Sequence, residues 1–409
     1  MPLMSTSNKT VIFLGDGMAD EPLDELDGRT PLQAANTPGM DRIAAEGCSG
    51  TLFTLPEAFP TSSEVANMSV LGCDLESEYP GRGPLEAAGR GVDLKPGDIA
   101  FRMNLVTLER GVLTDFSGGH IAQEDADALI GEMNRHFGAE SIRFHPGVSY
   151  RSLLVLSGPE FSPDVSTEKP DDNQGERLDR HLPVARSDRG KATALLLRRL
   201  MEEAPAILED SEVNRKRKAA GLSPANGVWP WNGGRAPALR SLNERYGISG
   251  AVISAVDVIM GLGKCLGMDT IEVPGATGYI DTNYEGKADA AVEALKSHDF
   301  VYLHVEAIDE VSHEQRLDLK LKAIEDFDAR VVRRVLDACD AALHAAVLPD
   351  HPVPIALGKH TRVPVPVAVR RSGLTPDEVM QFDEAAARHG RLGALYGSGL
   401  MDLLFRGAG

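Results

Sequence analysis

The stretch that decides the fold runs from Val11 to Gly17 and reads VIFLGDG. Four successive apolar residues predict a buried strand, and the Gly-Asp-Gly that follows predicts a tight acidic turn at its carboxyl end. In an open α/β sheet, ligands bind at this end of the strands. Asp16, between the two glycines, is therefore a candidate functional residue, although its carboxylate could also simply cap the next turn.

The elements that follow this strand alternate in type. A helical spacing begins at Pro38 and stops at Gly47, residues 51–55 form a second strand candidate, and residues 65–71 form a short helix after the hydroxyl-rich segment Pro60–Ser63. Alternation of strand and helix predicts a doubly wound α/β core with a mostly parallel sheet.

The pattern changes near Ala100, which predicts an inserted domain. A hairpin over 101–115, a helix over 123–137 and a strand over 149–156 precede the polar residues 158–189. We therefore expect a phosphotransfer core made of residues 1–98 and 188–409, and a smaller α+β cap domain over 99–187. The elements expected after the cap are a helix over 191–208, strands over 251–253 and 300–304, helices over 289–297 and 317–344, a strand over 364–369 and a closing helix over 395–405.

Composition excludes several classes of protein. The 409 residues are 42% hydrophobic and 25% charged, which is ordinary for a globular protein and too apolar for a disordered one. A net charge of −19 argues against nucleic acid or anionic lipid as a partner, so an anionic metabolite would need a local cluster of basic residues. The four cysteines form no Cys-x-x-Cys pair, and no signal peptide or stretch of ~20 apolar residues is present. We expect a soluble, cytoplasmic protein.

Two further segments carry residues typical of a metal centre. Asp309 and His313 are four residues apart, so on a helix both side chains lie on one face and can share a cation, although a surface ion pair has the same spacing. Asp350 and His351 follow an apolar strand, and His360 lies on the next loop. With Asp16, these carboxylates and imidazoles suit two divalent cations such as manganese or zinc.

Ser63 is the candidate nucleophile. It lies at the start of the short helix, where backbone N–H groups and the helix dipole favour a phosphoryl group. A metal ion on its hydroxyl would lower the hydroxyl pKa and supply an alkoxide near neutral pH. The alternative is that Ser62 or Ser63 only caps the helix.

These motifs, in this order, resemble the archaeal-type cofactor-independent phosphoglycerate mutases of the alkaline phosphatase superfamily, over nearly the whole chain. The segments that carry the resemblance are Val11–Gly17, Ser63–Gly72, Gly81–Ala87, Asn214, Arg217, Ala225–Asn226, Gly275–Gly278, Thr282–Asn283, Asp309–His313, Asp350–His351 and His360–Thr361. The resemblance implies an alkaline-phosphatase-like fold, a phosphoserine intermediate and two divalent cations, Mn²⁺ or Zn²⁺ and possibly Mg²⁺.

The resemblance also implies how the site residues divide. One cation would be held by Asp309, His313 and His360. The other would be held by Asp16, Asp350, His351 and the oxygen of Ser63. We expect four arginines to hold the phosphate and carboxylate of a small metabolite: Arg82, Arg102, Arg151 and Arg217.

Two departures keep alternative functions open. Where mutases of this type carry Asp-Arg-Arg-Ala-Gly-Arg, this chain has Asp115–His120, DFSGGH, and a second loop is altered at Lys169–Asn173. Both changes resemble a sister branch proposed to be homoserine kinases, which share the metal centre. The resemblance to the mutases implies that the protein interconverts 3-phosphoglycerate and 2-phosphoglycerate. The alternatives are ATP-dependent phosphorylation of homoserine and a non-catalytic metal- or phosphate-binding relative.

Two further segments have simpler interpretations. The basic run at 214–218 is either a solvated helix face or an anion contact. Trp229-Pro230-Trp231 is expected to be a packed loop and not a base-stacking platform, because the chain is acidic and has two tryptophans only.

Overall fold

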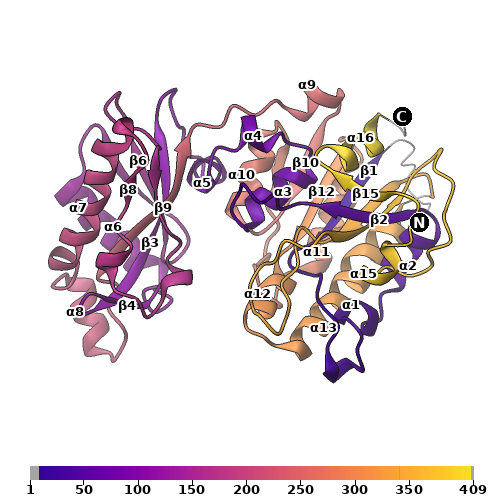
Figure 1. Ribbon diagram of the computed structural model, residues 1–409, viewed down its shortest axis with the longest axis horizontal. Helices are drawn as coiled ribbons and strands as arrows, with labels where there is room; N and C mark the ends of the chain where they lie inside the picture. The colour runs from indigo at the N-terminus through magenta and orange to yellow at the C-terminus, as the bar shows by residue number, and fades with distance from the viewer. Residues whose placement is uncertain (1–8, 340, 407–409) are drawn as a thin grey trace. The chain divides into compact units, whose positions relative to one another are not determined.

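The computed structural model describes residues 9–339 and 341–406 and divides the chain into two compact units. The larger unit contains Met1–Tyr79 and Leu239–Gly409, and the inserted unit is Pro80–Ala238. Figure 1 colours the chain by residue number, and the inserted unit runs from purple to salmon in it. Among the described residues, no helix combines the length and the apolar character that crossing a membrane requires.

The larger unit is built on an eight-stranded sheet. Its strands, in spatial order, are β11 (Asp269–Ile271), β10 (Gly250–Ile253), β12 (Phe300–Val305), β1 (Thr10–Gly15), β13 (His344–Leu348), β14 (Val365–Arg370), β2 (Cys48–Phe53) and β15 (Gly393–Tyr396). All of them run parallel to one another except β14, which is antiparallel to both of its neighbours. The expected mostly parallel α/β sheet is confirmed.

Helices cover both faces of this sheet. They are α1 (Pro31–Ala34), α2 (Pro38–Ala45), α3 (Ser63–Val70), α4 (Leu75–Glu78), α9 (Leu242–Tyr246), α10 (Asp257–Cys265), α11 (Tyr284–Ala294), α12 (Ala307–His313), α13 (Leu317–Asp326), α14 (Arg333–Ala338), α15 (Glu384–Ala387) and α16 (Gly399–Phe405). Alternate residues of β1, Val11 and Phe13, pack into one core with α2, α11, α13 and α14. On the opposite face, Tyr302 contacts α3, and Phe300 contacts Phe405 of α16.

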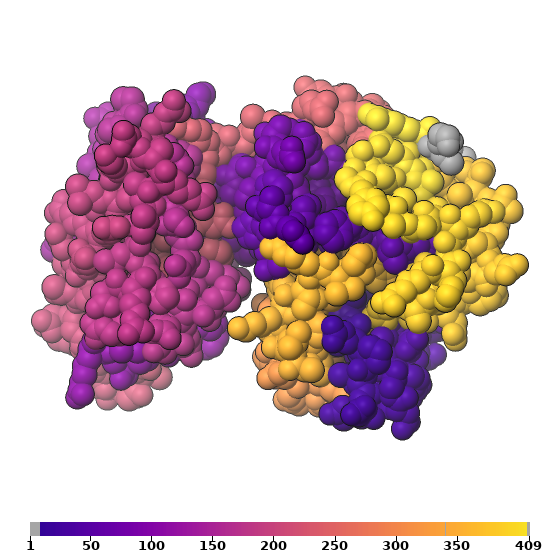
Figure 2. Space-filling model, in the orientation of Figure 1, coloured from indigo at the N-terminus to yellow at the C-terminus, as the bar shows by residue number. Residues whose placement is uncertain are grey.

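The first and last parts of the chain fold together in the larger unit. Strand β2 lies between β14 and β15, so a strand from the N-terminal part of the chain pairs with two strands from its C-terminal part. Figure 2 shows the same relation at the surface, where indigo and yellow segments of this unit adjoin.

Two expected helices differ from the structure. The helix expected over 317–344 ends at Ala338, and it contains a π-helical turn at Phe327–Val332 between α13 and α14. His344, the last residue of that expected helix, is instead the first residue of β13 (His344–Leu348), and β13 is the apolar strand expected before Asp350 and His351. At the C-terminus, Gly393–Tyr396 form edge strand β15 beside β2, and the helix begins only at Gly399.

The inserted unit has its own sheet around the long strand β3. Its strands are β3 (Ile99–Glu109), β4 (Val112–Asp115), β5 (Ile142–Pro146), β6 (Arg151–Leu156) and β9 (Gly227–Arg235), with the pair β7 (Val165–Ser166) and β8 (Val184–Ala185) beside it. Its helices are α5 (Arg82–Gly89), α6 (Gln123–Phe137), α7 (Lys191–Leu208) and α8 (Glu212–Ala219). Leu129 of α6 and Leu197 of α7 share one core with Phe101 of β3.

The inserted unit is wider at both ends than the expected 99–187, which corrects the boundary. Strand β9 pairs with β3 from Ile99 to Val106, so residues up to 235 belong to this sheet. The expected packed loop at Trp229-Pro230-Trp231 is part of β9, with both tryptophans buried. At the other end, Glu86 of α5 pairs with Arg102 of β3, which brings α5 into the same unit.

A buried ion pair ties together two loops of the larger unit. Lys320 of α13 is fully buried, and its Nζ donates to Asp20 Oδ2 at 2.8 Å and to the carbonyl of Val353 at 2.9 Å. Asp20 Oδ2 also accepts the backbone N–H of Ile355 at 3.1 Å. The segment after β1 and the segment after β13 are thereby held to one another and to α13.

We expect Lys320→Met to lower the free energy of unfolding by about 3–5 kcal/mol, because it leaves the Asp20 carboxylate buried without its cation. Lys296→Met is the matched control, since Lys296 pairs with Glu293 on the surface of the same unit and should contribute less than about 1 kcal/mol. Urea denaturation followed by far-UV circular dichroism measures both variants. Equal losses for the two would contradict a structural role for the buried pair.

Candidate metal centre and nucleophile

The candidate site lies where three adjacent parallel strands end. Asp16 follows β1, Asp350 and His351 follow β13, and Asp309 and His313 lie on α12, which begins after β12. Because β12, β1 and β13 are neighbours with the same direction, their carboxyl ends meet at one edge of the sheet.

Gly17 allows the turn after β1 to approach α12. Its φ is +65°, and a Cβ added there would lie 2.7 Å from Asp309 Oδ1. A side chain at this position would therefore push Asp309 away. The Gly-Asp-Gly segment thus serves the close approach of two candidate ligands.

The first group consists of Asp309, His313 and His360. Asp309 Oδ2 lies 3.3 Å from His313 Nε2, and Asp309 Oδ1 lies 3.5 Å from His360 Nε2. The two Nε2 atoms are 2.9 Å apart. His313 Nδ1 is 2.8 Å from the carbonyl oxygen of Gly358, which can only accept, so Nδ1 carries the proton and the Nε2 lone pair of the neutral ring faces the group.

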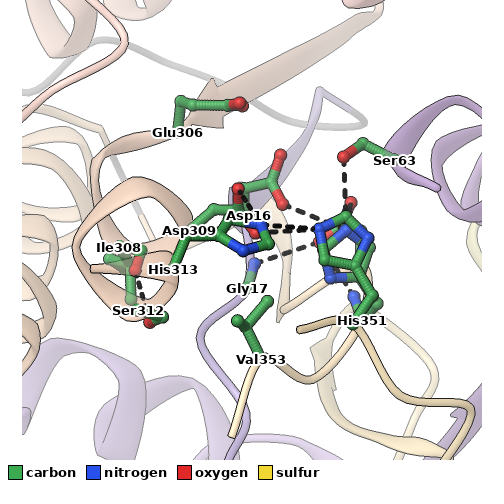
Figure 3. A network of polar contacts seen from close by, with 12 residues as sticks. Asp16, Gly17, Ser63, Glu306, Ile308, Asp309, Ser312, His313, His351 and Val353 are labelled. Atoms are coloured by element: carbon green, nitrogen blue, oxygen red, sulfur yellow. Dashed lines mark hydrogen bonds and ion pairs between the residues drawn. The ribbon is translucent and has the colours of Figure 1, made fainter. Parts of the chain in front are cut away.

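The second group consists of Asp16, Asp350, His351 and Ser63, all of them buried. His351 Nε2 lies 3.4 Å from Asp16 Oδ1 and 3.3 Å from Asp350 Oδ2. Ser63 Oγ lies 3.2 Å from the same nitrogen, and Figure 3 shows the hydroxyl pointing from α3 toward the His351 ring. The His351 ring also stacks on His360 at 3.8 Å between centroids, so the two groups adjoin.

The side chains of Ser62 and Ser63 do not cap helix α3. Ser62 is the N-cap residue, yet its side chain makes no capping hydrogen bond. Ser63 is the first helical residue, and its Oγ faces His351 instead of the helix backbone. The geometry therefore favours a role for Ser63 in the site over the alternative of helix capping.

The electrostatics of the site fit bound cations. Burial, and then the neighbouring Asp350, raise the pKa of Asp16 well above its usual value. The buried Oδ1 atoms of Asp16 and Asp309 accept no hydrogen bond. Buried carboxylates are stable only when they are paired or coordinate a metal ion.

Within residues 9–339 and 341–406, three sets of side chains could each hold a metal ion. They are Asp309 with His351 and His360, Asp16 with Asp350 and His351, and Asp16 with His304 and Glu306. Mixed carboxylate and imidazole donors suit divalent ions such as zinc and manganese.

The sequence prediction did not include four buried or mostly buried residues around the site: Asn67, Tyr302, His304 and Glu306. His304 Nε2 lies 3.0 Å from Asp16 Oδ2, and Asn67 Nδ2 donates to Asp350 Oδ2 at 2.9 Å. The available signal was the polar alternation of Tyr302, His304 and Glu306 through an otherwise apolar strand and its end. Asn67 gave a weaker signal, one helical turn after Ser63.

Three of the four candidate substrate arginines gather in the inserted unit. Burial alone would raise the pKa of Glu86, but Arg102, Arg82 and Arg151 hold it below its usual value. The guanidinium groups of Arg82 and Arg102 both lie over the Trp231 ring, at 5.8 and 5.6 Å.

Arg217 lies elsewhere in the inserted unit and has other contacts. Its guanidinium donates to the carbonyl oxygens of Gly118 at 2.8 Å and Ser223 at 3.0 Å, and it pairs with Asp125. Asn214 is buried on the same helix, whereas Lys216 pairs with Glu212 at the surface. The basic run at 214–218 is thus partly buried and partly a solvated face.

Comparison with known proteins supports a single family. The family described as 2,3-bisphosphoglycerate-independent phosphoglycerate mutase matches residues 44–214. A curated protein of that name from Methanosarcina acetivorans is 48% identical over 97% of this chain and 100% of its own length.

Solved structures agree over almost the full length. A protein from Pyrococcus horikoshii is 29% identical, with a TM-score of 0.82 and 98% of both chains covered. The cofactor-independent phosphoglycerate mutase from Thermoplasma acidophilum is 31% identical, with a TM-score of 0.64, and covers 98% of this chain and 100% of its own.

We expect the metal-free protein to become less stable as pH rises from about 4.5 to 8. Burial, and then Asp309, raise the pKa of Glu306 to about 8, so the folded state binds a proton more tightly than the unfolded chain in this window. Glu306→Gln removes the titrating group and should reduce this slope, with each pKa unit equivalent to about 1.4 kcal/mol.

Thermal unfolding of the metal-free wild type and Glu306→Gln at pH 5 and pH 8 measures the slope. The variant should gain stability relative to the wild type at pH 8 and little at pH 5. The same pH slope in both proteins would show that Glu306 is not the group responsible.

Proposed function

The chain belongs to the 2,3-bisphosphoglycerate-independent phosphoglycerate mutase family, and we propose that it interconverts 3-phosphoglycerate and 2-phosphoglycerate through a phosphoserine at Ser63. The observation that carries the proposal is the position of Ser63 Oγ, 3.2 Å from His351 among the candidate metal ligands. A hydroxyl at that place can attack a phosphoryl group that the site itself holds.

The proposal includes two divalent cations, Mn²⁺ or Zn²⁺ and possibly Mg²⁺. Asp309, His313 and His360 would hold one of them. The ligands of the other would be Asp16, Asp350, His351 and the oxygen of Ser63. When bound, these ions would lower the pKa of the serine hydroxyl and offset negative charge on the phosphoryl oxygens.

The chain itself positions the reacting groups. Ser63 stands at the first residue of α3, where the helix dipole favours the dianionic phosphoryl group. The phosphoryl group leaves one substrate oxygen as its bond to Ser63 Oγ forms, and then returns to the other hydroxyl of the same glycerate. The glycerate must therefore stay bound and reorient between the two transfers, which requires a site closed to water.

Substrate binding belongs to the proposal as well. Arg82, Arg102 and Arg151 are a cluster of guanidinium groups that can bind phosphate or carboxylate bidentately. All three arginines lower the pKa of Glu86, so they lie near one another, and this supports a common anion-binding role. Arg217 is supported less, because it lies apart from this cluster and its guanidinium is held by two backbone carbonyls and Asp125.

One observation keeps homoserine phosphorylation as a second candidate. The segment Asp115–His120, which has no arginine, forms a tight turn in which Asp115 accepts hydrogen bonds from Ser117 and Gly119. Two or three guanidinium groups that mutases of this type usually carry are therefore replaced by a turn that the Asp115 carboxylate stabilises. The relatives named as mutases favour the first candidate.

Parallel assays separate the candidates. The purified protein with Mn²⁺ is supplied with 3-phosphoglycerate in an assay coupled to removal of 2-phosphoglycerate, and separately with ATP and homoserine. Turnover in the first assay alone supports the mutase, turnover in the second alone supports the kinase, and turnover in neither leaves a non-catalytic relative. The expected cytoplasmic location and the absence of a nucleic-acid partner stay predictions.

We expect Ser63→Ala to lower turnover by at least ~10³-fold, because the variant loses the oxygen that accepts the phosphoryl group. Ser62→Ala is the matched control and should be much milder, since Ser62 has no capping hydrogen bond to lose. Mass spectrometry after brief incubation with 3-phosphoglycerate should find phosphate on Ser63. A Ser63→Ala variant that keeps most of its activity would point to a different nucleophile.

A further inference from the structure

Strand β12 presents two buried polar side chains to the face of the sheet that carries α3. Tyr302 and His304 are two residues apart, so they point to the same side of the strand, and both are fully buried. Neither belongs to the ligand sets proposed above. Each nevertheless leads by hydrogen bonds to a carboxylate of the second candidate metal site.

Tyr302 reaches Asp350 through Asn67. The Tyr302 hydroxyl lies 2.5 Å from Asn67 Oδ1. Asn67 Nδ2 donates to Asp350 Oδ2 at 2.9 Å and to the backbone carbonyl of Ser63 at 2.8 Å. One buried amide thus connects the candidate nucleophile with a candidate metal ligand.

The hydroxyl of Tyr302 fixes which way this amide faces. Burial, and then Asp350, raise the pKa of Tyr302 well above its usual value, so the phenol stays a donor and its partner atom on Asn67 must be an acceptor. Asn67 therefore presents Oδ1 to Tyr302 and both N–H groups to Asp350 and Ser63. A flipped amide would put Oδ1 against a carboxylate oxygen and leave the phenol without an acceptor.

His304 reaches Asp16 directly, in a defined tautomer. The backbone N–H of Val256 donates to Ser254 Oγ at 3.0 Å, and the Ser254 hydroxyl lies 3.1 Å from His304 Nδ1. Because an ionised carboxylate oxygen can only accept, His304 carries its proton on Nε2 and donates it to Asp16 Oδ2 at 3.0 Å, and Nδ1 accepts the hydrogen bond of the Ser254 hydroxyl.

The two oxygens of the Asp16 carboxylate therefore have different surroundings. His304 occupies Oδ2, while Oδ1 accepts no hydrogen bond and faces His351. Hydrogen bonds to one oxygen of a ligating carboxylate orient the other toward the metal ion.

We propose that Tyr302, through Asn67, and His304 are positioning residues that hold Asp350, Ser63 and Asp16 in place for the second metal site, and that they are not metal ligands. The inference rests on the proposed metal-dependent phosphotransfer through Ser63. It differs from the alternative in which His304 joins Asp16 and Glu306 as a ligand set of its own.

The test titrates Mn²⁺ into the metal-free full-length protein by isothermal calorimetry. Tyr302→Phe removes only the hydroxyl, and the matched control is Tyr284→Phe, because Tyr284 is equally buried in the same unit and its hydroxyl has no hydrogen-bond partner. We expect two Mn²⁺ per wild-type chain. In Tyr302→Phe one of the two should bind about 10–100-fold more weakly, the other should be unchanged, and Tyr284→Phe should match the wild type.

A pair of His304 variants separates a donor from a ligand. His304→Gln keeps an N–H that can reach Asp16, whereas His304→Leu does not. If His304 is a positioning residue, His304→Gln should bind both Mn²⁺ ions nearly as tightly as the wild type. His304→Leu should still bind two Mn²⁺ ions, but the second of them more weakly. Where the proteins turn over 3-phosphoglycerate, kcat should fall in Tyr302→Phe and in His304→Leu while KM stays near the wild-type value.

Each other outcome overturns a stated part. Mn²⁺ binding in Tyr302→Phe equal to that in Tyr284→Phe overturns the role of Tyr302 and Asn67. A third Mn²⁺ in the wild type that both His304 variants lose makes His304 a ligand. A wild type that binds two Mn²⁺ without turning over 3-phosphoglycerate overturns the proposed activity, while the titrations still decide the positioning roles.

Discussion

Asp16, Asp309 and Asp350 share one buried corner of the larger unit, and the charge of these carboxylates is the constraint on which the rest of the site depends. Like charges in a water-excluded place repel one another and lose their hydration, so the folded chain must supply compensation. His313, His351 and His360 give part of it, and they hold the pKa of Asp309 below its usual range although burial alone would raise it. Asp16, which has less help, shows the opposite shift.

The scaffold keeps this corner in place through contacts that do not belong to the ligand sets. Three neighbouring parallel strands deliver the carboxylates to one edge, and Gly17 lets two of them approach. Lys320 then ties the loop after β1 to the loop after β13. A site built on strand ends and braced from behind can hold its ligands to the tolerance that metal coordination needs.

Much of this arrangement could be predicted from the sequence, because it is encoded locally. VIFLGDG predicts a strand and an acidic turn, and the four-residue spacing of Asp309 and His313 predicts one helix face; the structure has both. What could not be predicted depends on pairing between distant segments. The C-terminal residues Gly393–Tyr396 are a strand only because β2 lies beside them, and Trp229 is in a strand only because β3 pairs with it.

Buried polar partners were the other limit. Tyr302 in β12 has the spacing of an ordinary core residue, and nothing local shows that its hydroxyl meets Asn67. The same holds for Asn67, which an isolated helix would leave facing solvent or its own backbone. Residues that act through another side chain become visible only when the partner is in place.

The insertion does not disturb the site because residues of the larger unit just before and just after the inserted segment contact one another. Glu78 lies just before the inserted unit and Arg245 shortly after it, and they form a buried ion pair in which Arg245 Nη2 lies 2.7 and 2.8 Å from the two carboxylate oxygens of Glu78. Arg240 adds a second, exposed contact to Glu78. Arg245 also donates to the carbonyl of Gly72, at the end of the helix that begins with Ser63. The chain thus leaves and re-enters the larger unit at one cross-linked place, so helix α3 is held by contacts of its own unit, whatever the inserted residues do.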